Sequence, residues 1–256
     1  MRTRVFLAPP VVPFLAATLA LAQAPPARDA ADSRKEGREL FRKVVEALGS
    51  AGKVAAAKDV RVEASVTIRT EEGALTIGIV QTTVLPGRLR QEIQASFGTM
   101  TTVVTEKDAF LVTPDGLQDL PPPALAEQRK ELALSILRLA QRPSDPKLSL
   151  SAAGRAKVGG VDTAILDVSY DGAEARWFVD PATGRILRTR VLSNRGEGDA
   201  ERLTDYSDFR PVDGLVFAFH QETTIDGKKE QTIDVTRIQV NTSPDIKIFD
   251  RPAPPR

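Results

Sequence analysis

The chain has 256 residues, and its 35 basic and 34 acidic side chains leave a formal net charge of +1. This near-balance excludes the strongly basic surface that nucleic-acid-binding domains present to phosphate groups. The chain has no cysteine, which excludes disulfide bonds and thiolate-bound metal, and we expect no cofactor. A core built from the 41% of residues that are hydrophobic must stabilise the fold alone.

The first 22 residues have the pattern of a secretory signal peptide. Arg2 and Arg4 precede an apolar run over 5–21, and Ala20-Leu21-Ala22 matches a cleavage site. Prolines interrupt this run, so a membrane-spanning helix is the less favoured alternative. We expect residues 1–22 to be removed on export, and the Ala/Pro-rich residues 23–32 to form a disordered linker.

A first helix is predicted to begin at Ser33, which has capping-box spacing with Glu36, and to end at Gly49. Its apolar residues form one stripe, which needs an apolar partner surface. From Val60 to Ile68 the hydrophobic period changes to two residues, which predicts a long half-buried strand. Because no helix separates the strands that follow, neighbours should pair antiparallel. These strands are expected at 75–79, 89–95, 101–105 and 109–113.

A second helix is predicted over 123–141, after three consecutive prolines and before Arg142-Pro143. Its apolar stripe is wide, so this helix also needs a surface to cover it. The stripe contains Leu125, Leu132, Leu134, Ile136, Leu137 and Leu139.

The carboxyl half returns to strands, with turn signals at intervals typical of hairpins. One segment, Trp177 to Arg190, contains an aspartate, a Pro-x-x-Gly and arginines, and so resembles an active-site loop. Alternation places Trp177 and Val179 on one face of a strand, while Asp180 can form an Asx-turn and Gly184 can take a positive φ. We therefore interpret the segment as a hairpin.

These elements predict one domain over 33–252, mainly β with two helices. Several predicted strands reach about ten residues, or roughly 33 Å, and each has one apolar face. We expect a curved antiparallel sheet that forms an open, incomplete β-barrel, with the helices capping its apolar side.

The sequence gives little support for catalysis. It has no nucleophile elbow, P-loop or dinucleotide-binding glycine pattern. His220 is the only histidine, and alternation places it on the polar face of a strand, where we expect a solvated side chain. Asp205 and Asp208 are candidates for the paired carboxylates of a glycosidase, although they lie near a strand end. We expect a protein that is not an enzyme, with a hydrolase as a remaining alternative.

Three segments of the carboxyl half resemble the lipoprotein-carrier superfamily (LolA/LolB-like), whose domains sort outer-membrane lipoproteins. They are WFVDPATGRILR, YSDFRPVDGLVFAFHQETTIDGK and IQVNTSPDIKIFDRP. The resemblance implies an unclosed barrel whose concave apolar face is capped by helices and holds acyl chains in the periplasm. No residue here could be matched to the arginine that anchors the lid of these carriers. The matched framework positions are Trp177, Asp180, Gly184, Asp213, Gly214, Phe217, Phe219, Asp226, Gly227, Asn241, Phe249 and Pro252.

On this basis we expect a monomeric periplasmic carrier or sensor of lipoprotein acyl chains or other hydrophobic ligands. A sixteen-carbon chain in water costs roughly 12 kcal/mol, so binding requires an apolar groove rather than a surface patch. A displaceable lid is expected to contain Leu132, Ile136 and Leu139. The residues expected in the groove are Val62, Val66, Ile77, Ile79, Trp177, Val179, Phe217 and Phe219.

Two alternatives to ligand binding remain open at the level of sequence. The helices could complete a dry core and leave no groove. The domain could also be a ligand-free scaffold for an envelope protein such as a peptidase or a regulator.

Overall fold

A computed structural model describes residues 29–71, 73–95, 98–194 and 199–253. Its strands in the amino half are β1 (Asp59–Thr70), β2 (Gly73–Val84), β3 (Arg88–Ala95), β4 (Gly98–Val104), β5 (Ala109–Thr113) and β6 (Gly116–Asp119). Those in the carboxyl half are β7 (Leu148–Val158), β8 (Val161–Tyr170), β9 (Ala173–Val179), β10 (Ile186–Asn194), β11 (Asp199–Val212), β12 (Leu215–Ile225) and β13 (Lys228–Val240).

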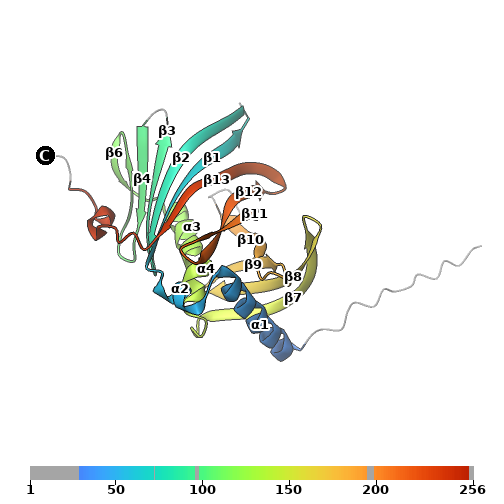
Figure 1. The fold of residues 1–256 in the computed structure, drawn as a ribbon. Helices are drawn as coiled ribbons and strands as arrows, with labels where there is room; N and C mark the ends of the chain where they lie inside the picture. Colours follow the sequence, from blue (N-terminus) through green and yellow to red (C-terminus); the bar gives the residue numbers. More distant parts are fainter. Residues whose placement is uncertain (1–28, 72, 96–97, 195–198, 254–256) are drawn as a thin grey trace, which may run out of the picture.

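All thirteen strands of the described residues belong to one antiparallel sheet, in the order β6-β5-β4-β3-β2-β1-β13-β12-β11-β10-β9-β8-β7. The sheet curves strongly but its edge strands, β6 and β7, do not pair, so the predicted open barrel is confirmed (Figure 1). Each half of the chain forms one side of the sheet, and β1 pairs with β13 where the halves meet. The short strand β6 was not predicted, because four residues are too few to show alternation.

Four α-helices are present among the described residues in place of the two predicted: α1 (Ala30–Leu48), α2 (Ala51–Ala56), α3 (Pro122–Ala133) and α4 (Ile136–Ala140). A 3-10 helix, η1 (Ile246–Phe249), follows the last strand. None of the helices in the described part of the chain has the length and hydrophobicity needed to cross a membrane.

The amino end of α1 differs from the prediction. Asp29, and not Ser33, caps the helix, because its carboxylate accepts the N–H of Ala31 at 2.9 Å. The Ser33 hydroxyl instead donates to the carbonyl oxygen of Ala152 in β7, at 2.7 Å. Residues 30–32, expected in the linker, are therefore helical, while the rest of that segment before residue 29 and the signal peptide lie outside the described residues. Gly49 ends the helix as predicted.

The single helix predicted over 123–141 is wrong. The chain leaves the helical conformation at Leu134 and Ser135, and Ser135 is extended, with ψ 121°. The two parts pack in different places: Leu132 of α3 contacts the cluster around Leu89 and Val104, while Leu139 of α4 joins the core under α1. One straight helix could not make both contacts. The break could not be predicted from the sequence, because the apolar periodicity continues across it.

The main core lies between α1 and strands β7 to β9 on the concave side of the sheet. The rings of Phe41 and Trp177 stack here, with centroids 6.2 Å apart. Trp177 and Val179 share the buried face of β9, as the alternation predicted. Most of this part of the sheet is packed core, although Ala175 and Trp177 also border a cavity on the concave side.

The segment after β9 is a hairpin turn, as predicted. The Asp180 carboxylate accepts the Thr183 hydroxyl at 2.6 Å and the Ala182 N–H at 2.9 Å, and these bonds lower the pKa of Asp180. Gly184 has φ 72°, and a Cβ there would clash with the carbonyl oxygen of Lys43 in α1. The turn therefore packs directly against α1, and this close contact requires a glycine at position 184.

The convex side of the sheet is covered at one end by the segment after β13. Phe249 of η1 is buried against Val103 and Phe110, outside the sheet beside β4 (Figure 1). Arg251 binds the carboxylate of Asp108 through two hydrogen bonds and that of Asp119 through one. Strands β4 and β5 are thus packed on both faces, against η1 outside and against α3 inside.

Candidate ligand cavity

A cavity of about 760 Å³ lies on the concave side of the sheet, between the strands and helices α1, α3 and α4. Its volume is within the range of natural small-molecule sites. The cavity exists because the helices cover only the two ends of the concave face. The apolar cluster at the centre, around Ala64, Val235 and Ile238, contains no helix residue among those described.

One wall of the cavity is apolar and is formed by β2, β1 and β13. The sheet register sets its side chains in rows: Val66 lies between Ile77 and Ile233, and Ala64 lies between Ile79 and Val235. Such rows arise because alternate residues of each strand face the same side. These two central rows are aliphatic and no helix of the described residues packs on them, while Gln81 and Gln231 lie in the rows on either side.

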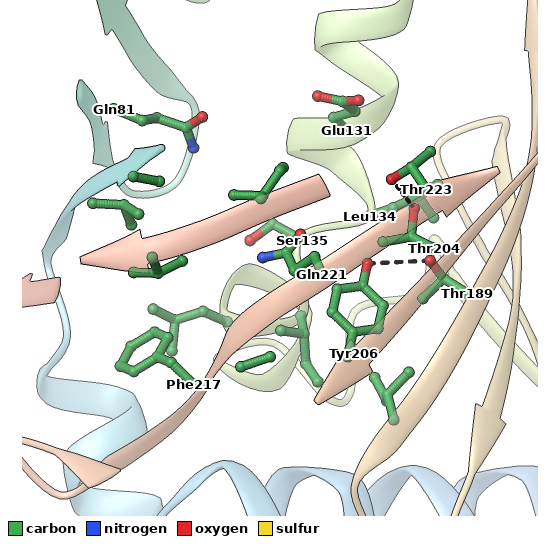
Figure 2. A pocket seen from close by; sticks show the side chains of 18 of the residues that line it. Gln81, Glu131, Leu134, Ser135, Thr189, Thr204, Tyr206, Phe217, Gln221 and Thr223 are labelled. Carbon is green, nitrogen blue, oxygen red and sulfur yellow. Dashed lines mark hydrogen bonds between the residues drawn. The ribbon is translucent and has the colours of Figure 1, made fainter. Parts of the chain in front are cut away.

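The part of the sheet formed by β10, β11 and β12 carries a group of hydroxyls among apolar side chains such as Ile186 and Val191, and we call it the polar wall. The hydroxyls of Thr189 and Tyr206 are 3.2 Å apart, and those of Thr204 and Thr223 are also 3.2 Å apart. Figure 2 shows these four side chains together on one side of the cavity, with Phe217 on the other. Burial raises the pKa of Tyr206, so its hydroxyl stays protonated and can donate a hydrogen bond. We call these four residues the hydroxyl strip.

Charged side chains connect α3 to the polar wall. Arg202 of β11 donates to the carboxylate of Glu131 in α3 at 2.6 Å. Burial disfavours the charged form of Arg202 and so lowers its pKa. The negative charge of Glu131 and the hydrogen bond to it have the larger combined effect, and the pKa of Arg202 is raised. The ammonium group of Lys130 donates to the carbonyl oxygen of Leu192 in β10. Two polar contacts therefore hold α3 against the sheet, in addition to Leu132.

The residues predicted to bind ligand divide into two groups. Val179 is completely buried in the core under α1, and Phe219 packs under the guanidinium of Arg210, so neither is on the cavity wall. Of the three predicted lid residues, Ile136 lines the cavity. Leu132 is buried in the cluster around Leu89 and Val104, and Leu139 is buried in the core under α1. The remaining predicted residues all line the cavity: Val62, Val66, Ile77, Ile79, Trp177 and Phe217.

The hydroxyl strip and the Arg202–Glu131 pair were not predicted. Only apolar faces were expected to bind ligand, although alternation alone places Arg202, Thr204 and Tyr206 on one face of β11. The contact between Arg202 and Glu131 joins residues far apart in the sequence, and no local pattern indicates it.

The residues considered for catalysis lie away from the cavity. Asp205 pairs with Arg188, and Asp208 pairs with Arg210, which lowers the pKa of Asp208. His220 Nδ1 is 2.7 Å from the Asp234 carboxylate. In the described parts of the chain, no group of three or more potential ligand side chains is placed to hold a metal ion.

No protein-family model matches the chain, and no curated protein matches it significantly. Several solved structures do match it. An outer membrane lipoprotein-sorting protein domain from Vibrio parahaemolyticus has a TM-score of 0.58 and 11% identity, covering 85% of this chain and 97% of its own. A DUF1329 family protein from Desulfovibrio piger has a TM-score of 0.60 and 13% identity, with the same coverage. A LolA superfamily protein from Nitrosomonas europaea has a TM-score of 0.58 and 11% identity, covering 84% and 97%.

The chain therefore has the fold of these lipoprotein-sorting domains over most of its length. The resemblance found in the carboxyl half of the sequence is confirmed at the level of the fold, and it extends to the amino half.

Proposed function

We propose that this protein is a periplasmic carrier or sensor that binds acyl chains or other hydrophobic ligands in the cavity. The observation that carries the proposal is the aliphatic wall of β2, β1 and β13, which faces open volume instead of a helix. The fold shared with lipoprotein-sorting domains supports it. Export through the signal peptide at residues 1–22 is part of the proposal.

The energetics favour a long apolar ligand. Transfer of a sixteen-carbon chain out of water releases roughly 12 kcal/mol, which is available only where most of the chain is enclosed. The rows of side chains on the apolar wall, such as Ile77, Val66 and Ile233, run across three strands and offer a long contact surface. A flat surface patch would leave half of such a chain in water.

The helix α3 is the element that we propose to move when ligand enters. It is held by Leu132 and by the polar contacts of Lys130 and Glu131, whereas α1 is anchored by a large core. The extended Ser135 separates α3 from α4 and can act as its hinge. Ile136, just beyond the hinge, would contact the ligand from the helix side.

The test is ligand uptake by delipidated protein. Trp177 is the single tryptophan and lines the cavity, so its fluorescence reports directly on occupancy by a fatty acid or an acylated peptide. Saturable binding is expected. A delipidated, folded protein that takes up neither ligand would contradict the proposal, and stable capture of an envelope protein by the empty domain would favour the scaffold alternative instead.

A matched pair of variants locates the site. Ile79→Glu places a carboxylate on the apolar wall and should weaken uptake by roughly tenfold or more, because burying an unpaired charge beside an alkyl chain is costly. Thr76→Glu is the control, since Thr76 is an exposed residue of the same strand and points to the opposite face. Equal losses in both variants would place the ligand elsewhere.

A further inference from the structure

The charges inside the cavity are unequal. Of the described residues that line it, four are charged: Lys130, Glu131, Arg185 and Arg202. Three are cations and one is an anion, although the whole chain is nearly neutral. An apolar cavity that encloses excess positive charge favours an anionic group among its contents.

Arg202 is the cation best placed to meet such a group. Its side chain is only 22% exposed, it donates a hydrogen bond to the Glu131 carboxylate, which is 44% exposed, and the negative charge of Glu127 also acts on it. A guanidinium has five N–H donors, so a second carboxylate or a phosphate can bind beside Glu131 or replace it. Lys130 and Arg185 have other contacts, with the Leu192 carbonyl oxygen and the Phe209 ring.

The position of Arg202 also gives the ligand a direction. Arg202, Thr204 and Tyr206 are alternate residues on the cavity face of β11, so Arg202 lies at one end of the hydroxyl strip. The strip crosses to β12 because Thr204 pairs in register with Thr223. A polar track that ends in a cation therefore lines the same cavity as the aliphatic wall.

We infer that the preferred ligand is an acyl amphiphile with an anionic head group, a carboxylate or a phosphate, bound by Arg202. Its chain lies along the wall of β2, β1 and β13, and oxygen atoms next to the head group accept hydrogen bonds from the hydroxyl strip. This inference rests on the binding function proposed above and specifies the chemical class of its ligand.

The experiment compares three sixteen-carbon probes that differ only in the head group: hexadecanoate, hexadecanol and hexadecylamine. Binding to the delipidated full domain is followed by Trp177 fluorescence and checked by calorimetry. Hexadecanoate should bind about tenfold more tightly than hexadecanol, with hexadecylamine weakest, because a charge-assisted hydrogen bond is worth about one order of magnitude or more. Equal affinities for the acid and the alcohol would overturn the head-group inference and leave the binding function intact. Failure of all three to bind would remove the binding function itself.

Arg202→Gln tests the residue. It should abolish the preference for hexadecanoate and leave hexadecanol binding unchanged. Arg188→Gln is the matched control, because Arg188 lies on the neighbouring strand β10, faces the convex side and also pairs with one carboxylate, that of Asp205. An equal loss of hexadecanol binding in Arg202→Gln would show that Arg202 only holds α3 in place, and would overturn the inference.

Glu131→Gln provides a second test that does not depend on how Arg202→Gln folds. Removing the carboxylate that occupies Arg202 should strengthen hexadecanoate binding several-fold, with less change for the alcohol. Weaker binding of hexadecanoate in this variant would contradict the role assigned to Arg202.

Discussion

Two regions of the concave face have the same alternating pattern of apolar residues but differ in how deeply those residues are buried. On β9, the alternate residues Ala175, Trp177 and Val179 are all buried, in a cluster that α1 covers. On β2, Ile77 and Ile79 alternate just as regularly, yet they remain partly exposed and line the cavity. Ala175 and Trp177 also border the cavity, so the two strands differ in how completely a helix covers them. Alternation therefore identifies the inward face, and the placement of the helices decides whether that face becomes core or binding surface.

The largest expected effect comes from truncating one residue in each region. Leu166→Ala removes a side chain with 0% exposure from the core under α1, and should cost about 3 kcal/mol of unfolding free energy. Ile77→Ala removes a similar volume from the cavity wall, where no cavity needs to be created, and should cost about 1 kcal/mol. Denaturant unfolding of both variants measures the difference. Equal costs would mean that the two regions are packed alike.

The contact between the β9–β10 turn and α1 gives the next largest effect. Gly184→Ala should cost about 2 kcal/mol, because the residue has a positive φ and its Cβ would meet the Lys43 carbonyl oxygen. Gly172→Ala is the control, since Gly172 has φ 81° but no atom near the position of a Cβ, and should cost about 1 kcal/mol. Thermal unfolding of both variants separates the backbone cost from the contact with α1. Similar melting temperatures of the two variants would indicate that the turn does not pack tightly against α1.

The smallest expected effect is the dependence of stability on pH in the acidic range, which comes from Asp180 in the β9–β10 turn. The hydrogen bond from Thr183 holds the pKa of Asp180 below its ordinary value of 3.8. The stability that this carboxylate contributes is therefore complete above pH 3.8 and is lost as the pH falls through the lowered pKa. Asp180→Asn should remove this component, so its melting temperature should fall less steeply than that of the wild type over the same acidic range. Parallel curves would contradict the assignment.

Much of the fold could be predicted from the sequence because hairpins are local. The alternation of Val62 with Val66, and of Trp177 with Val179, gives the inward face of each strand, and turn signals such as Asp213-Gly214 fix which strands are neighbours. The curvature and the uncovered centre follow from how helices and sheet meet, which no single segment specifies.

The site was predicted only in its apolar half for the same reason. Val62 and Ile79 are recognised as inward-facing from β1 and β2 alone. Arg202 and Glu131 meet across 71 positions of sequence, and the pattern of neither β11 nor α3 indicates this contact. Phe219 shows the opposite error, because it lies on an apolar face and yet the guanidinium of Arg210 covers its ring.

The pairing of β1 with β13 has a consequence for how the protein is made. The Thr236 hydroxyl donates to the Glu63 carbonyl oxygen at 3.0 Å, across 173 positions of sequence. Pairings between such distant segments form late in folding. A chain in which β13 has not yet paired with β1 has no complete aliphatic wall, so the cavity forms only when this pairing is made. Completion of the sheet and formation of the cavity then coincide.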